Sequence, residues 1–203
     1  MYTEKFKYKL IEIILKNLSK NYSFNTSLEN SLKELKTKIS DNKRISTYYF
    51  PNNFQSFIIE YINKVNEELL KVSKKKIENK GVSDKIFTLV IERLIILSKY
   101  KIANKKIFRF LCLPQNIIFS NKILFKISDE IWFISGDQSL DFNFYSKRFI
   151  LMNIYLATFI FWINDDSINL EMTKEFLKKQ IKKTSVIGKY KVLLKNLISK
   201  FNF

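Results

Sequence analysis

Apolar side chains recur along most of the chain at spacings of three and four residues, which is the pattern of amphipathic helices. The first such segment spans residues 4–20, where lysines separate the apolar positions Phe6, Leu10, Ile13, Ile14 and Leu18. The later segments with this pattern are residues 25–39, 41–49, 51–78, 83–102, 103–113, 115–135, 137–163 and 169–184. The sequence therefore predicts an all-α protein.

Few residues interrupt these helices, since the chain has only three glycines and two prolines. Pro51 is expected in the first turn of the helix 51–78, where its missing N–H group costs nothing. Pro114 is expected to end the helix before it. Gly81 and Gly136 are expected to end helices in the left-handed conformation. This composition favours long helices joined by short connections.

The segment that starts at Gly136 reads GDQSLDFNFYSKR and leads into the most apolar run of the chain. Asp137 and Ser139 are expected to cap a new helix there. One face of that helix carries charged and aromatic residues at helical spacing, namely Asp141, Phe144, Tyr145 and Arg148. The apolar run 149–163 is about 22 Å long as a helix, against roughly 30 Å for a bilayer core. We therefore expect a buried core helix.

The last segment, residues 186–203, contains lysines and no acidic residue. Its apolar face consists of Tyr190, Leu193, Leu194, Leu197, Ile198 and Phe201. A helix of this kind can lie in the interface of an anionic membrane. It can equally pack its apolar face on the protein's own core, and the pattern alone favours neither.

The composition excludes most catalytic chemistry. The chain has no histidine, so it has no imidazole base, no Ser-His or Cys-His nucleophile and no His-ligated metal site. Its glycines are too scattered for a phosphate-binding loop, and the adjacent carboxylates Asp165 and Asp166 fit a helix end. Cys112 is expected to be a small buried hydrophobe. We expect no enzyme activity, no cofactor and no metal.

The net charge of +17 comes from lysines spread along the whole chain. It favours nucleic acid or an anionic membrane over acidic-surfaced partners, but so even a distribution points to no single surface. The first residues, MYTEKFKYK, show neither the apolar core of a secretory signal nor the arginines of a transit peptide.

Residues 45–62, ISTYYFPNNFQSFIIEYI, resemble the end of the helix-turn-helix in TetR-type regulators. The turn before this segment has no glycine, and the would-be recognition helix 41–49 ends in bulky aromatic residues. A reading helix needs several polar side chains in the major groove, and the candidates are only Arg44, Ser46 and Thr47. We therefore expect residues 1–50 to form a degenerate helix-turn-helix, and nucleic acid is not an expected partner.

Three motifs, RFLCLPQN, GDQSLDFNFYSKR and FWINDDS, follow one another within residues 109–166. Their order and spacing resemble those of the accessory proteins of coenzyme Q (ubiquinone) biosynthesis, the ninth-numbered component of that pathway. The resemblance implies a TetR-like bundle over residues 51–184 that holds an isoprenoid quinone precursor. It also implies that residues 186–203 are a membrane-binding amphipathic helix. TetR-like domains often pair through their last helices, so a homodimer is expected.

The resemblance assigns a role to the face formed by Asp141, Phe144, Tyr145 and Arg148. From the pattern alone, Phe144 and Tyr145 are core residues. They match the family's partner-binding patch, however, which contacts the di-iron hydroxylase that modifies demethoxyubiquinone. Phe144 stands where the family commonly has tryptophan, so the expected contact area is smaller.

Helical facing gives a candidate lining for the lipid pocket that the resemblance implies. These residues are Ile91, Leu94, Leu97, Phe110, Leu113, Ile117, Leu124, Ile127, Ile131, Tyr155 and Phe159. The favoured function is a non-enzymatic lipid-binding accessory protein at the inner face of the cytoplasmic membrane, or at the matrix side of a mitochondrial membrane. The alternative is a TetR-like, ligand-responsive DNA-binding regulator.

Overall fold

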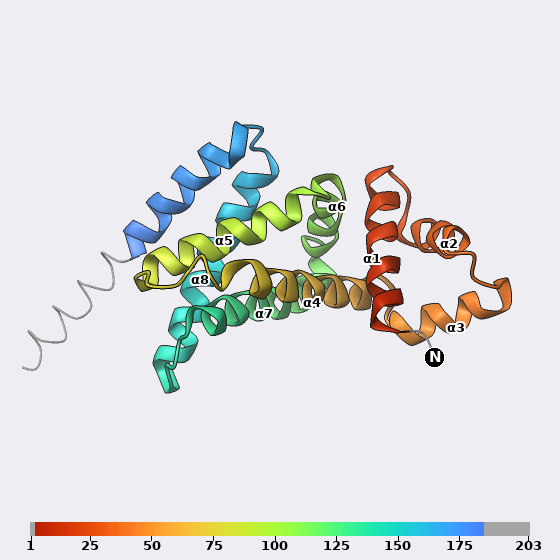
Figure 1. Ribbon diagram of the computed structural model, residues 1–203, viewed down its shortest axis with the longest axis horizontal. Helices are drawn as coiled ribbons and strands as arrows, with labels where there is room; N and C mark the ends of the chain where they lie inside the picture. Colours follow the sequence, from red (N-terminus) through yellow and green to blue (C-terminus); the bar gives the residue numbers. More distant parts are fainter. Residues whose placement is uncertain (1–2, 185–203) are drawn as a thin grey trace, which may run out of the picture. The chain divides into compact units, whose positions relative to one another are not determined.

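The computed structural model describes residues 3–184, which are largely helical and contain no strand within that range (Figure 1). The elements are α1 (Glu4–Ser19), α2 (Phe24–Glu34), α3 (Ile39–Tyr49), α4 (Asn53–Ser73), α5 (Val82–Ser98), α6 (Lys101–Leu111), η1 (Pro114–Asn116), α7 (Ile117–Ser135), α8 (Asp141–Ile163) and η2 (Ile168–Leu170). Residues 171–184 are also helical. The all-α prediction is confirmed.

The predicted amphipathic helix 186–203 lies outside the described residues. Its candidate membrane-binding residues are Tyr190, Leu193, Leu194, Leu197, Ile198 and Phe201. Their role stays a prediction.

The chain forms two compact units. Among the described residues, the first unit combines residues 3–73 with residues 92–127, and the second combines residues 74–91 with residues 128–184. The helices α5 and α7 each contribute residues to both units. The predicted division into residues 1–50, 51–184 and 186–203 stays a prediction.

Aromatic side chains from α2, α4 and α6 form a cluster in the first unit around the buried Phe57. The Phe24 ring centroid lies 4.9 Å from that of Phe54 and 5.4 Å from that of Phe57. Phe54 in turn lies 4.8 Å from Phe110, in an edge-to-face arrangement. Such pairs contribute beyond the area they bury. Phe50 and Phe57, on either side of Pro51, are therefore part of the core of this unit.

Ion pairs join α1 to α4 along the edge of that core. The Lys64 ammonium lies 3.1 Å from the Glu12 carboxylate and also contacts Glu68. The Lys7 ammonium lies 2.7 Å from the Glu60 carboxylate. Because both lysines are largely shielded from water, these pairs are screened less than pairs on the open surface.

Two expectations about the ends of α4 are wrong. Pro51 lies in a turn before the helix, since α4 begins at Asn53, whose φ is 50°. The helix ends at Ser73, and the left-handed residue in the connection to α5 is Asn79, with φ 58°, rather than Gly81. Asparagine adopts this conformation because its short polar side chain can bond locally.

Gly136 ends α7 as predicted, with φ 85°. Its N–H donates to the Phe133 carbonyl at 3.0 Å, and the Asp137 N–H donates to the Trp132 carbonyl at 3.1 Å. This pair of bonds is a Schellman motif, which satisfies the last carbonyls of the helix and favours glycine at the left-handed position. The chain therefore reverses sharply between α7 and α8.

The segment Phe142–Ile163 of α8 is long and apolar enough to cross a membrane by length and composition alone. Soluble core helices pass the same test, and α8 is buried on one side, where Leu151, Tyr155 and Trp162 are almost fully enclosed. Phe149 and Ile160 are exposed. The expected core helix thus has an open side.

Candidate partner-binding site

The connection between α7 and α8 is built around the buried carboxylate of Asp137. This side chain is 4% exposed and accepts hydrogen bonds from Ser139 Oγ at 2.6 Å, Lys147 Nζ at 2.8 Å and Arg148 Nη1 at 3.3 Å. Burial alone would raise the pKa of Asp137, but these hydrogen bonds outweigh it and hold the pKa below its usual value. Asp137 is therefore an ionised anchor.

The prediction that Asp137 and Ser139 cap the following helix is wrong. The helix α8 begins at Asp141, and its N-cap Leu140 makes no side-chain capping bond. Asp137 is instead committed to Lys147 and Arg148, which lie one to two turns inside α8. Asp137 thus attaches the loop before α8 to side chains within the helix, rather than to the free N–H groups at its start.

Arg148 joins three parts of this region. Its Nε donates to Asp129 Oδ1 of α7 at 2.6 Å, and its Nη1 donates to Asp137 and, at 3.1 Å, to the Phe144 carbonyl. The residue is only 4% exposed. A planar guanidinium suits such multiple donation. We call Asp129, Asp137, Lys147 and Arg148 the Arg148 frame.

Trp132 adds a second connection between α7 and α8. Its indole N–H donates to the Lys147 carbonyl at 3.1 Å, and the Lys147 ammonium lies 5.2 Å from the Trp132 ring centroid. The last turns of α7 and the first turns of α8 are therefore held together by hydrogen bonds, ion pairs and a cation–π contact.

The exposed part of the site is aromatic. Phe142 is 71% exposed, and Tyr145 and Phe149 are each 65% exposed. These three residues lie at i, i+3 and i+7 of α8 and so share one side of the helix. We call them the aromatic face. The region combines a buried ionic frame with an open apolar surface, which suits binding of another macromolecule.

The predicted partner-binding residues divide between these two layers. Tyr145 is on the surface, whereas Phe144 is half-buried with its ring centroid 3.3 Å from the Arg148 guanidinium carbon. Asp141 is the first residue of α8, and its side chain lies outside what the structure describes. Sequence reasoning missed Phe142 and Phe149. Their helical spacing relative to Tyr145 was a signal, but spacing does not show which side of a helix faces water.

The predicted lipid-lining residues are placed in both units. Most are buried, namely Ile91, Leu94, Leu97, Ile127, Ile131 and Tyr155, whereas Phe110, Leu124 and Phe159 are half-buried. Leu113 and Ile117 are 41% and 56% exposed. Ile91, Ile131, Tyr155 and Phe159 belong to the second unit and the others to the first. A lipid pocket formed by this set stays a prediction.

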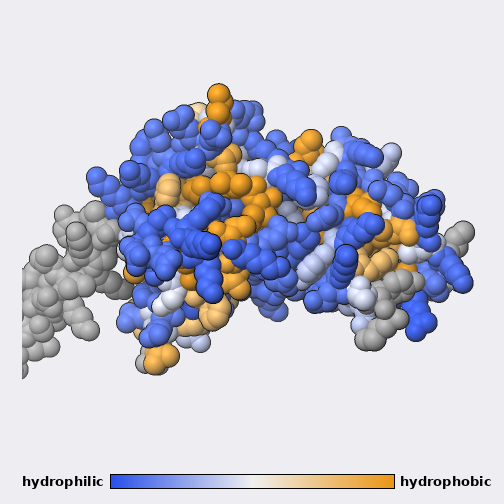
Figure 2. All heavy atoms as spheres, in the orientation of Figure 1, coloured by the Kyte–Doolittle hydropathy of each residue, from blue (hydrophilic) through white to orange (hydrophobic). Residues whose placement is uncertain are grey.

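The second unit contains a surface pocket of about 380 Å³ that the sequence did not suggest. It lies between the start of α5 and the helical residues 171–184, and it is lined by Ser83, Asp84, Phe87, Lys178, Ile181 and Lys182. Hydrophobic residues also reach the surface elsewhere, as the face drawn in Figure 2 shows. None of the predicted lipid-lining residues lines this pocket.

Among residues 3–184, no cluster of three or more Cys, Asp and Glu could hold a metal ion. Cys112 is exposed, so the expectation that it is a buried hydrophobe is wrong; it lies at the end of α6, where the chain turns. Asp165 does lie at a helix end. Its carboxylate accepts from the Thr173 N–H at 2.9 Å and the Ser167 N–H at 2.8 Å.

The would-be DNA-reading residues are in α3. Arg44 and Thr47 are exposed, but the Ser46 hydroxyl donates to the Asn42 carbonyl of its own helix at 2.8 Å. Tyr48 is 63% exposed beside them. Of the three candidates, Ser46 is therefore turned back onto its own helix, whereas Arg44 and Thr47 remain exposed.

The fold resembles that of a TetR transcriptional regulator from Nitrosomonas europaea. The TM-score is 0.70 at 17% sequence identity, over 89% of this chain and 98% of the regulator. At this identity the similarity concerns the fold alone. The predicted TetR-like helical fold is confirmed.

Sequence comparison points to one family. Residues 118–188 match the COQ9 family model. The chain is 31% identical over 147 residues to the ubiquinone biosynthesis protein COQ9, mitochondrial, of Bos taurus, an alignment that covers 68% of this chain and 46% of the relative. It is 34% identical over 128 residues to the protein of the same name from Rattus norvegicus, covering 63% and 41%. The resemblance to the COQ9 family is confirmed, and the chain spans about half the length of these relatives.

Proposed function

We propose that this chain is an accessory protein of ubiquinone biosynthesis. The observation that carries the proposal is its similarity to proteins named as ubiquinone biosynthesis proteins, over about two thirds of the chain. The aligned family segment, residues 118–188, includes the Arg148 frame and the aromatic face. The Arg148 frame and the aromatic face thus belong to the part of the chain that resembles these relatives.

The role is non-enzymatic. The chain has no histidine, and the polar residues of the candidate site are bonded to one another rather than arranged around an open reaction centre. Ionised Asp137 is surrounded by donors, so it is neither a free base nor a nucleophile. The region is organised for binding.

The aromatic face docks the demethoxyubiquinone hydroxylase. Interface anchors are enriched in aromatic residues, and the strongest of them lie at the centre of a contact. Tyr145 has both an apolar ring and a hydroxyl, and Phe142 and Phe149 extend the apolar area on either side. The Arg148 frame lowers the entropy that is lost on binding, because it orders the start of α8 before the partner arrives.

The protein binds an isoprenoid quinone precursor and presents it at a membrane. Exposing a polyprenyl tail to water is unfavourable by about 25 cal/mol per Å² of apolar surface, so a carrier protein must shield it. The buried apolar residues of the predicted lining supply a suitable environment within each unit, and residues 186–203 would contact the anionic membrane. The relatives' names favour the mitochondrial one of the two predicted locations.

Native mass spectrometry combined with vesicle flotation tests the lipid part of this proposal. Protein purified from a ubiquinone-producing cell should carry an isoprenoid quinone precursor and should float with anionic vesicles. A truncation after residue 184 should float less. Protein that is consistently free of lipid and does not float would contradict a carrier role.

The alternative role, a DNA-binding regulator, is supported by the fold alone. A regulator would select one operator sequence over random duplex DNA, whereas a merely cationic protein binds any duplex and releases it as salt rises. Electrophoretic mobility shifts with genomic fragments at increasing salt distinguish the two. We expect no selection.

A further inference from the structure

A long segment of the first unit is basic without a single acidic residue. Between Glu92 and Asp129 the chain has eight basic residues, which are Arg93, Lys99, Lys101, Lys105, Lys106, Arg109, Lys122 and Lys126. The chain as a whole has 19 acidic residues among 203, so about three would be expected here if they were evenly spread. This segment covers most of α6 and α7 and the turn between them. Arg93 is buried and bonded to Asn66. Five of the others are exposed, namely Lys99, Lys105, Arg109, Lys122 and Lys126, and such a surface is suited to an anionic partner.

The turn between α6 and α7 exposes apolar side chains. Leu113 is 41% exposed, Ile117 is 56% exposed and Ile118 is 74% exposed. We call these three residues the α6–α7 tip. Large aliphatic side chains that gather in this way usually mark a surface that contacts an apolar phase or a partner.

The α6–α7 tip is a built structure. Beneath it, Asn116 is 4% exposed, and its Nδ2 donates to the Phe110 carbonyl at 2.8 Å while its Oδ1 accepts from Gln55 Nε2 at 3.3 Å. The Ser120 hydroxyl contacts the carbonyls of Leu111 at 2.6 Å and Asn116 at 2.8 Å. Polar groups are thus bonded inward and the apolar side chains are directed outward.

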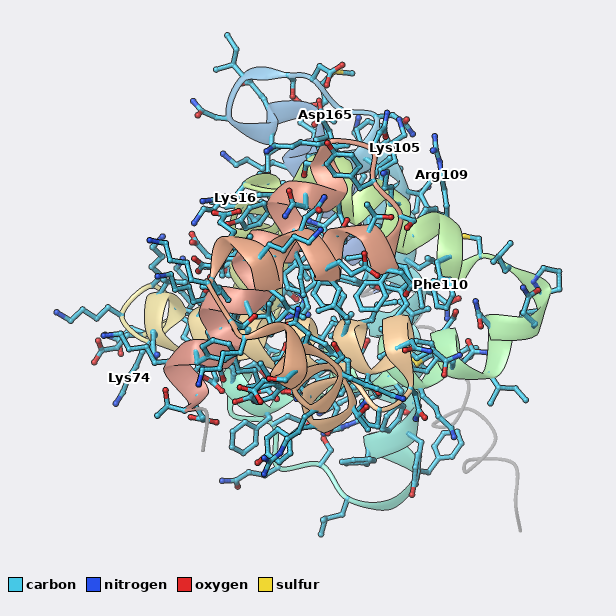
Figure 3. The ribbon with its side chains drawn as sticks, turned by 90° about the vertical axis from the view of Figure 1, so that its right-hand side faces the viewer. Lys16, Lys74, Lys105, Arg109, Phe110 and Asp165 are labelled. Atoms are coloured by element: carbon cyan, nitrogen blue, oxygen red, sulfur yellow. The ribbon has the colours of Figure 1, made fainter. Side chains whose placement is uncertain are left out.

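Basic residues flank the tip, with Arg109 and Lys122 about one helical turn from it and Lys105 one turn further back on α6. Arg109 and Lys105 are exposed on α6, and both are labelled in Figure 3. Lys122 is exposed on α7, four residues after Ile118 and therefore on the same side of that helix. One turn is about 5.4 Å along the axis. We call Lys105, Arg109 and Lys122 the basic collar.

We propose that the α6–α7 tip is a docking site for an anionic lipid bilayer, separate from residues 186–203. In a bilayer the hydrocarbon begins a few ångströms below the charged phosphates, and interfacial protein segments enter to a depth of about 5–10 Å. That depth matches the spacing of about 6 Å between the tip and its nearest collar residues, Arg109 and Lys122. An acidic protein surface would explain the basic collar, but it would not explain the three exposed aliphatic side chains of the tip. The bilayer accounts for both features.

Cys112 allows a direct test, because it is the single cysteine of the chain and is exposed beside the tip. The full chain is labelled there with an environment-sensitive thiol dye and mixed with phosphatidylcholine vesicles, with or without phosphatidylglycerol. With anionic vesicles the dye emission should shift to the blue and the dye should become protected from an aqueous quencher. Neutral vesicles should give neither effect, since the basic collar needs anionic headgroups.

Variants separate the two parts of the surface. The double change Ile117→Gln and Ile118→Gln should lower vesicle binding about tenfold, since two exposed aliphatic side chains are replaced. The double change Arg109→Gln and Lys122→Gln should lower binding to anionic vesicles and make it less sensitive to salt. The matched charge control is Lys33→Gln with Lys43→Gln, two exposed lysines of the first unit, which should leave binding unchanged.

Three outcomes would overturn the proposal. The dye could stay accessible to the quencher while the protein floats, in which case residues 186–203 alone bind the membrane. Neutral vesicles could protect the dye as well as anionic vesicles do, which would exclude a role for the basic collar. Protection by soluble heparin and not by vesicles would make the partner an acidic macromolecule. None of these results depends on lipid content or on hydroxylase binding, so those two parts of the proposed function are tested separately.

Discussion

The guanidinium carbon of Arg148 lies 3.3 Å from the centre of the Phe144 ring. The same guanidinium donates to Asp129 and Asp137, so Phe144 is held against a cation whose other side is committed to carboxylates. Arg148 and Phe144 therefore form the support of the site, and Phe142, Tyr145 and Phe149 form its surface. Changes in the supporting residues should therefore affect stability, and changes in the surface residues should affect binding.

Replacing Arg148 should destabilise the second unit. Arg148→Met would leave the buried carboxylate of Asp137 with fewer donors, and removing one partner of a buried ion pair costs about 3 kcal/mol. The free energy of unfolding, measured by urea denaturation, should fall by roughly this amount. Arg109→Met, at an exposed arginine, should change it by less than about 0.5 kcal/mol. Equal stability of both variants would contradict the supporting role of Arg148.

The two glycines near helix ends should respond differently to alanine. Gly136 has φ 85° and no heavy atom near the position of an added Cβ, so Gly136→Ala should cost about 1 kcal/mol through backbone strain alone. Gly81 lacks a positive φ, and an added Cβ would lie 3.9 Å from Asp84 Oδ2. Gly81→Ala should therefore be close to neutral in a thermal melt. A larger loss of stability at Gly81 than at Gly136 would show that the left-handed conformation at the end of α7 is not what makes glycine favourable there.

Asp165 should make stability depend on pH at the acid end. Burial alone would raise its pKa, but hydrogen bonds from Thr173 and Ser167 lower the pKa from 3.8 to about 2. Because the folded state holds the lower pKa, this contribution is present above about pH 4 and is lost as the pH falls toward 2.

Acid titration of the unfolding free energy measures this effect. Asp165→Asn should weaken the fall in stability between about pH 4 and pH 2 and should lower stability at pH 7. Glu29→Gln, at an exposed carboxylate of α2, should keep the stability at pH 7. An unchanged acid slope in Asp165→Asn would mean that the carboxylate does not anchor the helix 171–184.

The helices were largely predictable because their pattern is repeated over many turns. The α1 prediction, residues 4–20, differs from the observed Glu4–Ser19 by one residue. The ends of α4 were not predictable in this way. A turn places Asn53 at positive φ just after Pro51, and Asn79 rather than Gly81 takes the left-handed position in the following connection. Asparagine and glycine compete for such positions, and the outcome depends on local hydrogen bonds that spacing does not encode.

The sequence predicted where the candidate site lies along the chain, but not which of its side chains are buried. The motif from Gly136 to Arg148 located the reversal between α7 and α8, including the left-handed glycine. Helical spacing put Phe144, Tyr145 and Arg148 on one face. In the structure Arg148 is buried and paired with Asp129 and Asp137, whereas Tyr145 is exposed. Which charged residue is drawn inward depends on partners distant in sequence, such as Asp129. Spacing along one helix cannot reveal them.

The proposed binding of the demethoxyubiquinone hydroxylase by the aromatic face can be measured by titrating the hydroxylase with the full chain in an isothermal calorimeter. The wild-type chain should bind, Tyr145→Ala should lose about 2 kcal/mol or more of binding free energy as a central aromatic anchor, and Tyr48→Ala, at another exposed tyrosine, should bind like the wild type. Circular dichroism of all three should be the same. Absence of binding by the wild type, or equal binding by Tyr145→Ala, would mean that the aromatic face does not dock the hydroxylase.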